Sequence, residues 1–119
     1  MARILIVDDS RMSRRMLRGI LEGIGHEIVG EAGNGEEGIN IYKETNPDAV
    51  TMDITMPVKD GISCLKGIMD YDKNAKVIML TAAGQSSMLV ESLKEGAKEF
   101  ICKPYDPEQV INALNEVLK

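Results

Sequence analysis

Short runs of apolar residues alternate along the chain with longer stretches in which apolar positions recur every three or four residues. A short apolar run is typical of a buried strand, and the longer spacing is typical of a helix with one face on a core. The pattern predicts five strands, over residues 3–7, 27–31, 49–53, 76–80 and 100–102. It predicts five helices, which begin after Ser10, after Asn34, at Gly61, after Ser86 and after Asp106.

Apolar side chains at helical spacing are expected to pack on the sheet. In the first predicted helix these positions are Met12, Met16, Leu17, Ile20, Leu21 and Ile24. In the fourth they are Leu89, Val90, Leu93 and Ala97, with Gly96 near the end of the helix. Ser10, Asn34, Ser86 and Asp106 are residue types that favour the N-cap position. The two cysteines, Cys64 and Cys102, lack the spacing of a zinc site or a disulfide framework, so both are expected to be small buried residues.

Five alternating strands and helices joined by short loops predict a parallel sheet with helices on both faces and right-handed connections. The length of 119 residues suits one domain, and no repeat or linker interrupts the alternation, so residues 1–119 are expected to form a single α/β domain. In such a sheet, ligands bind outside the carboxyl ends of the strands.

Charge and hydropathy narrow the classes of partner. The net charge is −5 and the pI is about 4.9, which argues against nonspecific binding to nucleic acid or to an anionic membrane surface. The apolar runs are far shorter than the roughly 20 residues that span a bilayer, and the N-terminus runs into Asp8 and Asp9 without a cleavable leader. We therefore expect a cytoplasmic protein whose partners are proteins or small ions.

Polar residues collect where the predicted strands end. Asp8 and Asp9 follow the first strand, Asp53 ends the third, Thr81 follows the fourth and Lys103 follows the fifth. Three carboxylates at one edge repel one another, and a hard cation such as Mg²⁺ would relieve the repulsion. The lysine and the hydroxyl suit a phosphoryl group, and an aspartate can act as the nucleophile that accepts one. Asp53 is therefore the predicted reacting residue.

The order and spacing of these residues resemble those of bacterial response regulator receiver domains. The resemblance rests on Asp8-Asp9, on Met52-Asp53-Ile54-Thr55-Met56-Pro57 with Gly61, on Thr81-Ala82 and on Lys103-Pro104, and it covers the whole chain. Stand-alone chemotaxis receivers of the CheY type are the most similar, through the run 51–57 and through Gly84-Gln85. The resemblance implies a flavodoxin-like (βα)5 sandwich of three layers, with a five-stranded sheet of order 2-1-3-4-5.

The same resemblance implies a role for each site residue. Asp53 would be the phosphoacceptor and, with Asp9, a direct Mg²⁺ ligand, while Asp8 would act largely through water. Thr55 would contribute its backbone carbonyl to the metal. The phosphoryl oxygens would be held by Thr81, Ala82 and Lys103, with Thr55 as a further phosphoryl-binding residue. The peptide bond between Lys103 and Pro104 is expected to be cis.

Phe100 departs from the family pattern. It stands three residues before Lys103, where better-known chemotaxis receivers carry a switch tyrosine. A phenyl ring can move between exposed and buried positions as Thr81 is drawn toward a phosphoryl group, but it has no hydroxyl to donate. Coupling through Thr81 and Phe100 is therefore expected to depend on packing.

The implied partners are a sensor histidine kinase of the CheA type, a downstream protein such as the flagellar motor switch, and a phosphatase, with the receiver itself a monomer. Such a protein catalyses only its own phosphorylation and dephosphorylation. A second hypothesis is a phosphorelay carrier that passes its phosphoryl group to a histidine phosphotransfer protein. The sequence does not separate the two.

A competing motif has a different chemistry. The run 33–38 reads G-x-G-x-x-G, and Asp53 lies 20 positions beyond Gly33, as in a dinucleotide-binding fingerprint. However, Glu36 and Glu37 would put two negative charges where a pyrophosphate should bind, whereas carboxylates favour an empty helix N-terminus. A haloacid-dehalogenase-type phosphatase would need D-x-D-x-T after the first strand, which residues 8–12 lack. His26 is expected to be structural.

Overall fold

A computed structural model describes residues 1–54, 56, 58–82 and 86–119, and it shows the predicted alternation of strands and helices. The predicted residues Thr55 and Pro57 and the Gly84-Gln85 pair lie outside the described residues. The strands are β1 (Arg3–Val7), β2 (Glu27–Ala32), β3 (Ala49–Asp53), β4 (Val77–Thr81) and β5 (Glu99–Cys102). The helices are α1 (Arg11–Gly23), α2 (Gly35–Thr45), α3 (Gly61–Tyr71), α4 (Ser86–Lys94) and α5 (Pro107–Leu118).

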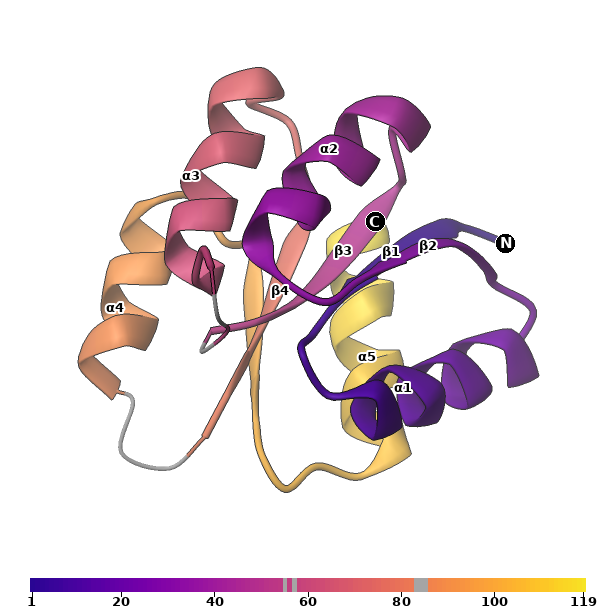
Figure 1. Ribbon diagram of the computed structural model, residues 1–119. Helices are drawn as coiled ribbons and strands as arrows, with labels where there is room; N and C mark the ends of the chain where they lie inside the picture. The colour runs from indigo at the N-terminus through magenta and orange to yellow at the C-terminus, as the bar shows by residue number, and fades with distance from the viewer. Residues whose placement is uncertain (55, 57, 83–85) are drawn as a thin grey trace.

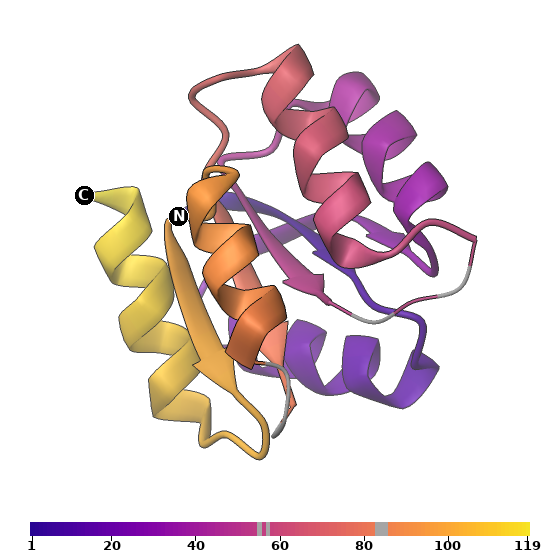
Figure 2. The same ribbon diagram turned by 90° about the vertical axis from the view of Figure 1, so that its left-hand side faces the viewer.

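The five strands form one parallel sheet in the order β2-β1-β3-β4-β5, which confirms the flavodoxin-like fold. Helices cover both faces, with α1 and α5 on one side and α2 and α3 on the other (Figure 1). The view turned by 90° shows α4 beside β5 (Figure 2), and Met88 of α4 packs against the same core cluster as α2 and α3. The sandwich therefore has three layers.

Alternate residues of the central strands point into two separate cores. In β1, Leu5 and Val7 pack under α2 and α3, whereas Ile4 and Ile6 pack with α1 and α5. All five residues of β3 are buried, as expected for a strand covered on both faces. Since every strand runs in the same direction, all five carboxyl ends lie at one edge of the sheet.

Helix starts follow local rules that the sequence reveals. The Ser10 hydroxyl accepts a hydrogen bond from the Ser13 N–H at 3.2 Å, and the Asn34 side chain accepts one from Glu37 at 2.9 Å, so both predicted N-caps are confirmed. The first residue of α5 is Pro107, directly after Asp106. Ser86 is the first residue of α4 rather than the residue before it.

Several predictions of burial are wrong. Met12 is 74% exposed, and Met16 and Ile24 are also exposed, so only Leu17 and Leu21 of the apolar stripe on α1 are fully buried. The predicted stripe is wider than the surface that the sheet and α5 offer to this helix. In the same way, Val90 and Leu93 of α4 are exposed, and Ala97 is buried beyond the end of the helix.

The two cysteines differ in their exposure to solvent. Cys64 is buried in the core as expected, where burial raises the pKa of its thiol to about 12. Cys102 is exposed, contrary to the prediction, because it lies on the edge strand β5. His26 accepts a hydrogen bond at Nδ1 from the Ala2 N–H at 2.9 Å, a contact between the residues that directly precede β2 and β1, which agrees with a structural role. In the part of the chain that is described, no helix is long and apolar enough to cross a membrane.

Candidate functional site

Asp53 is the last residue of β3, and the start of α3 is hydrogen-bonded to the residue that follows it. The Ile54 N–H donates to the Leu80 carbonyl of β4 at 3.2 Å, and the Gly61 N–H donates to the Ile54 carbonyl at 2.7 Å. A Cβ atom at position 61 would collide with the Asp53 carbonyl oxygen, so only glycine allows this approach. The start of α3 thus lies directly against the end of β3 and fixes the backbone of Asp53.

The loop after β1 brings two further carboxylates to this point. Asp8 is completely buried, its N–H donates to the Ala32 carbonyl at 2.9 Å, and its Oδ1 accepts from the Ser10 N–H at 2.8 Å. Asp9 is exposed. One carboxylate oxygen from each of Asp8, Asp9 and Asp53 lies within 4.8 Å of the other two. The predicted acidic cluster therefore exists.

Lys103 reaches the same cluster from the loop after β5, which is separated from β3 by β4. Its Nζ lies 3.4 Å from Asp53 Oδ1 and 3.9 Å from Asp8 Oδ2. Its backbone N–H donates to the Thr81 carbonyl at 2.7 Å, which fixes the loop after β5 against the end of β4. The Lys103–Pro104 peptide bond is cis, as expected.

Burial governs the protonation of the two inner carboxylates. Desolvation raises the pKa of Asp8 and of Asp53 above the usual range, the Lys103 charge opposes the rise at both, and their mutual repulsion adds to it at Asp53. Asp8 Oδ2 is buried and accepts no hydrogen bond from the described residues. A buried acceptor of this kind is costly unless a cation or donor satisfies it.

These features fit a hard divalent cation. Three carboxylates converge, one of them is open to solvent, and a buried oxygen is left to be satisfied, which is a set of ligands suited to Mg²⁺ or Ca²⁺. Among the described residues, Lys103 forms ion pairs with two of the three carboxylates, Asp8 and Asp53, and Arg14 adds a smaller electrostatic effect at Asp8. An additional positive charge would therefore be bound favourably here.

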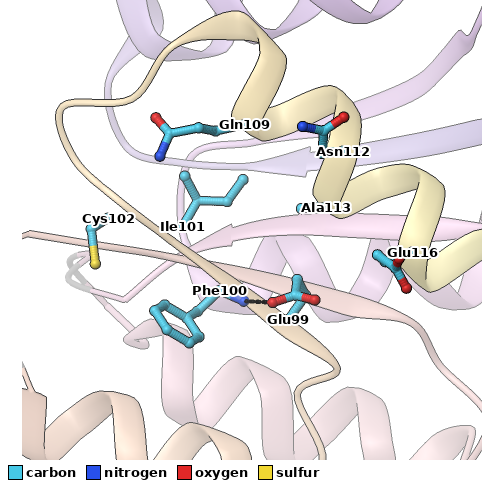
Figure 3. Close-up of a pocket in the computed structure, with 8 residues that line it drawn as sticks. All are labelled: Glu99, Phe100, Ile101, Cys102, Gln109, Asn112, Ala113 and Glu116. Carbon is cyan, nitrogen blue, oxygen red and sulfur yellow. Dashed lines mark hydrogen bonds between the residues drawn. The ribbon is translucent and has the colours of Figure 1, made fainter.

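The remaining described residues of the predicted site are Thr81, Ala82 and Phe100, which differ in burial and in position. Thr81 is the last residue of β4 and is buried, and its hydroxyl donates to the Ala82 carbonyl at 3.2 Å, while Ala82 is exposed. Phe100 is not part of the cluster. It is 39% exposed on β5 and lines a groove with residues of α5 (Figure 3).

Two residues that the sequence analysis did not single out belong to this region. Burial and the negative charges of Asp8 and Asp53 raise the pKa of the Tyr105 hydroxyl. Arg14 of α1 donates to the Asp8 carbonyl at 2.6 Å. Neither residue belongs to a recognisable sequence motif, and the sequence pattern around Arg14 predicts a solvent-exposed polar face of α1.

The glycine-rich run before α2 does not form a phosphate-binding loop. The Gly33 N–H donates to Glu37 Oε1 at 2.8 Å, the Gly35 N–H donates to the Lys59 carbonyl at 2.9 Å, and the Glu37 N–H is bound by Asn34. A Cβ at Gly35 would also collide with the Lys59 carbonyl. These donors are used within the protein, which supports the rejection of the dinucleotide-binding hypothesis.

A doubly wound parallel sheet with an aspartate at the end of its central strand, two acidic residues beside it and a lysine opposite defines the receiver class of domain. The chain belongs to the response regulator receiver domain family, whose match covers residues 4–115. It is 52% identical to the chemotaxis protein CheY of Thermotoga maritima over 98% of both chains, and 49% identical to CheY of Bacillus subtilis over 98% of this chain and 97% of that one.

Comparison with solved structures finds the same fold in a chain of similar sequence. One chain of the CheX-CheY-BeF3-Mg²⁺ complex from Borrelia burgdorferi superimposes with a TM-score of 0.93 at 44% identity, over 98% of this chain and 89% of that chain. The receiver fold and the sequence relationship thus extend over nearly the whole of residues 1–119, and the protein is a response regulator.

Proposed function

We propose that this receiver is a single-domain switch, spanning residues 1–119, that accepts a phosphoryl group on Asp53 and signals through a phosphorylation-dependent protein interaction in chemotaxis. The observation that carries the proposal is the position of Asp53. It ends a buried strand, lies 3.4 Å from the Lys103 ammonium and shares a cluster with Asp8 and Asp9. The phosphodonor would be a sensor histidine kinase of the CheA type in the cytoplasm.

In this reaction a carboxylate oxygen of Asp53 attacks the phosphorus of the donor. The new oxygen–phosphorus bond makes Asp53 an acyl phosphate. The bond from phosphorus to the donor's leaving group breaks and leaves its electron pair on that group. Lys103 faces Asp53 and would neutralise charge on the transferred oxygens. Thr81, at the end of β4, and Ala82 beside it would bind the phosphoryl oxygens.

The acidic cluster would hold Mg²⁺ through Asp8, Asp9 and Asp53, with the backbone carbonyl of Thr55 as a further ligand. The bound ion would supply charge neutralisation and would align the phosphoryl oxygens. Asp8 is fixed by its hydrogen bonds to Ala32 and Ser10, so its unsatisfied Oδ2 already points toward the cluster. That preorganisation supports the assignment.

The output surface would consist of α4, β5 and α5. Phe100, Val90 and Leu93 expose apolar area there, and a groove of about 400 Å³ lies between β5 and α5 (Figure 3). The groove is lined by Glu99, Phe100, Ile101, Cys102, Gln109, Asn112, Ala113 and Glu116. Relatives named chemotaxis protein CheY favour a role in chemotaxis. In that role the downstream partner would be the flagellar motor switch, and a phosphatase would end the signal.

Phosphorylation is tested with acetyl phosphate, Mg²⁺ and intact-mass analysis. We expect one added phosphoryl group, labile to alkali, in the parent chain and none in Asp53→Asn. Asp48→Asn is the matched control, because Asp48 precedes β3 at the opposite edge of the sheet and binds the Arg3 N–H at 2.8 Å. A parental yield in Asp53→Asn, or a group mapped to another residue, would refute the assignment.

A further inference from the structure

Arg14 fastens the loop that carries two of the three clustered carboxylates. Its Nη1 donates to the Asp8 carbonyl at 2.6 Å, and its Nε donates to Glu31 Oε1 of β2 at 3.2 Å. The side chain is only 18% exposed. A guanidinium holds two acceptors in a fixed geometry, so Arg14 ties the end of β1 to the end of β2.

The Asp8 carbonyl belongs to the peptide unit that joins Asp8 to Asp9. A peptide unit is planar, so fixing the direction of its carbonyl also fixes the direction of the Asp9 N–H. Two further groups of Asp8 are bound as well: its N–H donates to the Ala32 carbonyl, and its Oδ1 accepts from the Ser10 N–H. The Asp9 carboxylate, in contrast, is exposed, and its placement follows from the backbone that precedes it.

We propose that Arg14 is a positioning residue for divalent-cation binding. By holding the Asp8–Asp9 peptide plane, it sets where the Asp9 carboxylate faces Asp8 and Asp53. The inference rests on the proposed function, since the cation is the one that the acidic cluster would hold for phosphoryl transfer. Groups that orient metal ligands without touching the metal typically affect its affinity by 10- to 100-fold.

Arg18 provides a natural comparison one turn further along α1. It binds the second oxygen of Glu31 at 2.7 Å and Glu22 at 2.9 Å, so it shares the ion-pair network of Arg14. Among the described residues, its hydrogen bonds and ion pairs go to Glu31 and Glu22 and not to the acidic cluster, and its side chain is 38% exposed. A purely structural network would respond in the same way to the loss of either arginine, whereas a positioning role belongs to Arg14 alone.

The test compares Arg14→Met with Arg18→Met, both of which keep the length of an unbranched side chain and remove the charge. Mg²⁺ affinity is measured by amide NMR titration, and hydrogen exchange of the Ser10 N–H, which donates to Asp8 Oδ1, is measured without Mg²⁺. We expect about tenfold weaker Mg²⁺ binding and faster exchange at Ser10 in Arg14→Met, with both quantities near parental values in Arg18→Met. Arg14→Lys should recover part of the affinity, because an ammonium can reach the carbonyl but cannot also hold Glu31.

The outcomes separate this inference from the proposed function. Parental affinity and parental exchange in Arg14→Met, or equal losses in the two methionine variants, would overturn the role of Arg14. If the parent itself did not bind Mg²⁺, the proposed cation would be wrong, while exchange at Ser10 would still decide whether Arg14 fixes the Asp8–Asp9 peptide plane. If Arg14→Met did not fold, Arg14→Gln, which cannot span both acceptors, would be measured with the same expected loss.

Discussion

Lys103 Nζ lies 3.4 Å from Asp53 Oδ1, although the two residues are 50 positions apart in the chain. The contact follows from the topology, because β3 and β5 both flank β4 and their carboxyl ends meet at the same edge. Asp8 and Asp9 join them there. In the described part of the chain, Lys103 is the cation that forms ion pairs with this cluster, and Arg14 has a smaller effect at Asp8. The excess of negative charge determines how the site should respond to pH, metal and substitution.

The first prediction concerns pH in the absence of metal. Burial raises the pKa of Asp8 and Asp53, with Lys103 opposing it, so the folded protein binds these protons more tightly than the unfolded chain does. The stability that protonation adds is present below the unfolded pKa of about 4 and is lost as pH rises through the raised folded pKa.

In EDTA, Asp53→Asn should therefore be more stable than the parent at pH 7, on the order of 1 to 2 kcal/mol, because it removes a desolvated charge that also repels Asp8. The difference should shrink as the pH falls through the raised pKa of folded Asp53 toward the unfolded value of about 4. Urea unfolding at several pH values measures it. Glu31 contributes to the pH dependence in the opposite sense, because Arg18 and Arg14 lower its pKa overall although burial raises it. Since Glu31 is present in both proteins, the difference between the parent and Asp53→Asn isolates the effect of Asp53. A gap independent of pH would contradict the prediction.

Millimolar Mg²⁺ should raise the melting temperature of the parent chain. A ligand that binds only the folded state stabilises it by about 2.7 kcal/mol at a concentration 100 times its Kd. Asp9→Asn removes the exposed carboxylate of the cluster and should reduce the shift, whereas Asp48→Asn at the opposite edge should leave it unchanged. Thermal unfolding with and without Mg²⁺ decides, and an unshifted parent would exclude a magnesium site.

Replacement of Lys103 should affect chemistry more than folding. Without its ammonium, charge on the transferred phosphoryl oxygens is less neutralised, and phosphorylation of Lys103→Met by acetyl phosphate should slow by about 100-fold. Lys98→Met is the control, because Lys98 precedes β5 and lies at the other end of that strand. Rates come from the time course of intact-mass measurements. Equal rates in the two variants would remove Lys103 from the reaction.

Val58 should be replaceable with a gain in stability. Its φ is 68°, in the left-handed region that a β-branched residue tolerates poorly, and it is 83% exposed, so little packing is lost on substitution. Val58→Asn should stabilise the protein by about 1 kcal/mol, since asparagine enters this region more readily. Val90→Asn, at an exposed helical valine, should give no such gain. Urea unfolding measures both, and a loss at position 58 would show that the strain is absent.

Beryllofluoride, a mimic of the phosphoryl group, should change the surface around Phe100 through Thr81. Movement of the ring can bias the switch only by the difference in its contact energy between the two states, and burial of an aromatic ring contributes about 1 to 3 kcal/mol. Amide NMR should show shifts reaching residues 88–102 in the parent and smaller ones in Thr81→Ala, with Phe100→Tyr tolerated. Shifts confined to the loops of Asp8, Asp9 and Asp53 would favour a phosphorelay carrier.

The sequence alone determined the features that depend on neighbours in the chain. The alternation of patterns gave the five strands and five helices, and side chains such as Ser10 and Asn34 marked where helices begin, because an N-cap bonds to backbone only a few residues away. It also brought Asp8, Asp9, Asp53 and Lys103 to one edge, since parallel strands place their carboxyl ends together. Their assigned chemical roles remain predictions.

Only the tertiary structure decided how much of each apolar stripe is covered and which backbone groups are held from a distance. Met12 and Leu17 follow the same helical pattern, yet one is exposed and the other is buried, because burial depends on the width of the surface that packs against the helix. The sequence predicts that Arg14 is a surface arginine, but its side chain binds the Asp8 carbonyl. Every residue has a backbone carbonyl, so no sequence pattern distinguishes this one. Such contacts depend on the relative placement of β1, β2 and α1, which is set by the packing of the whole sheet.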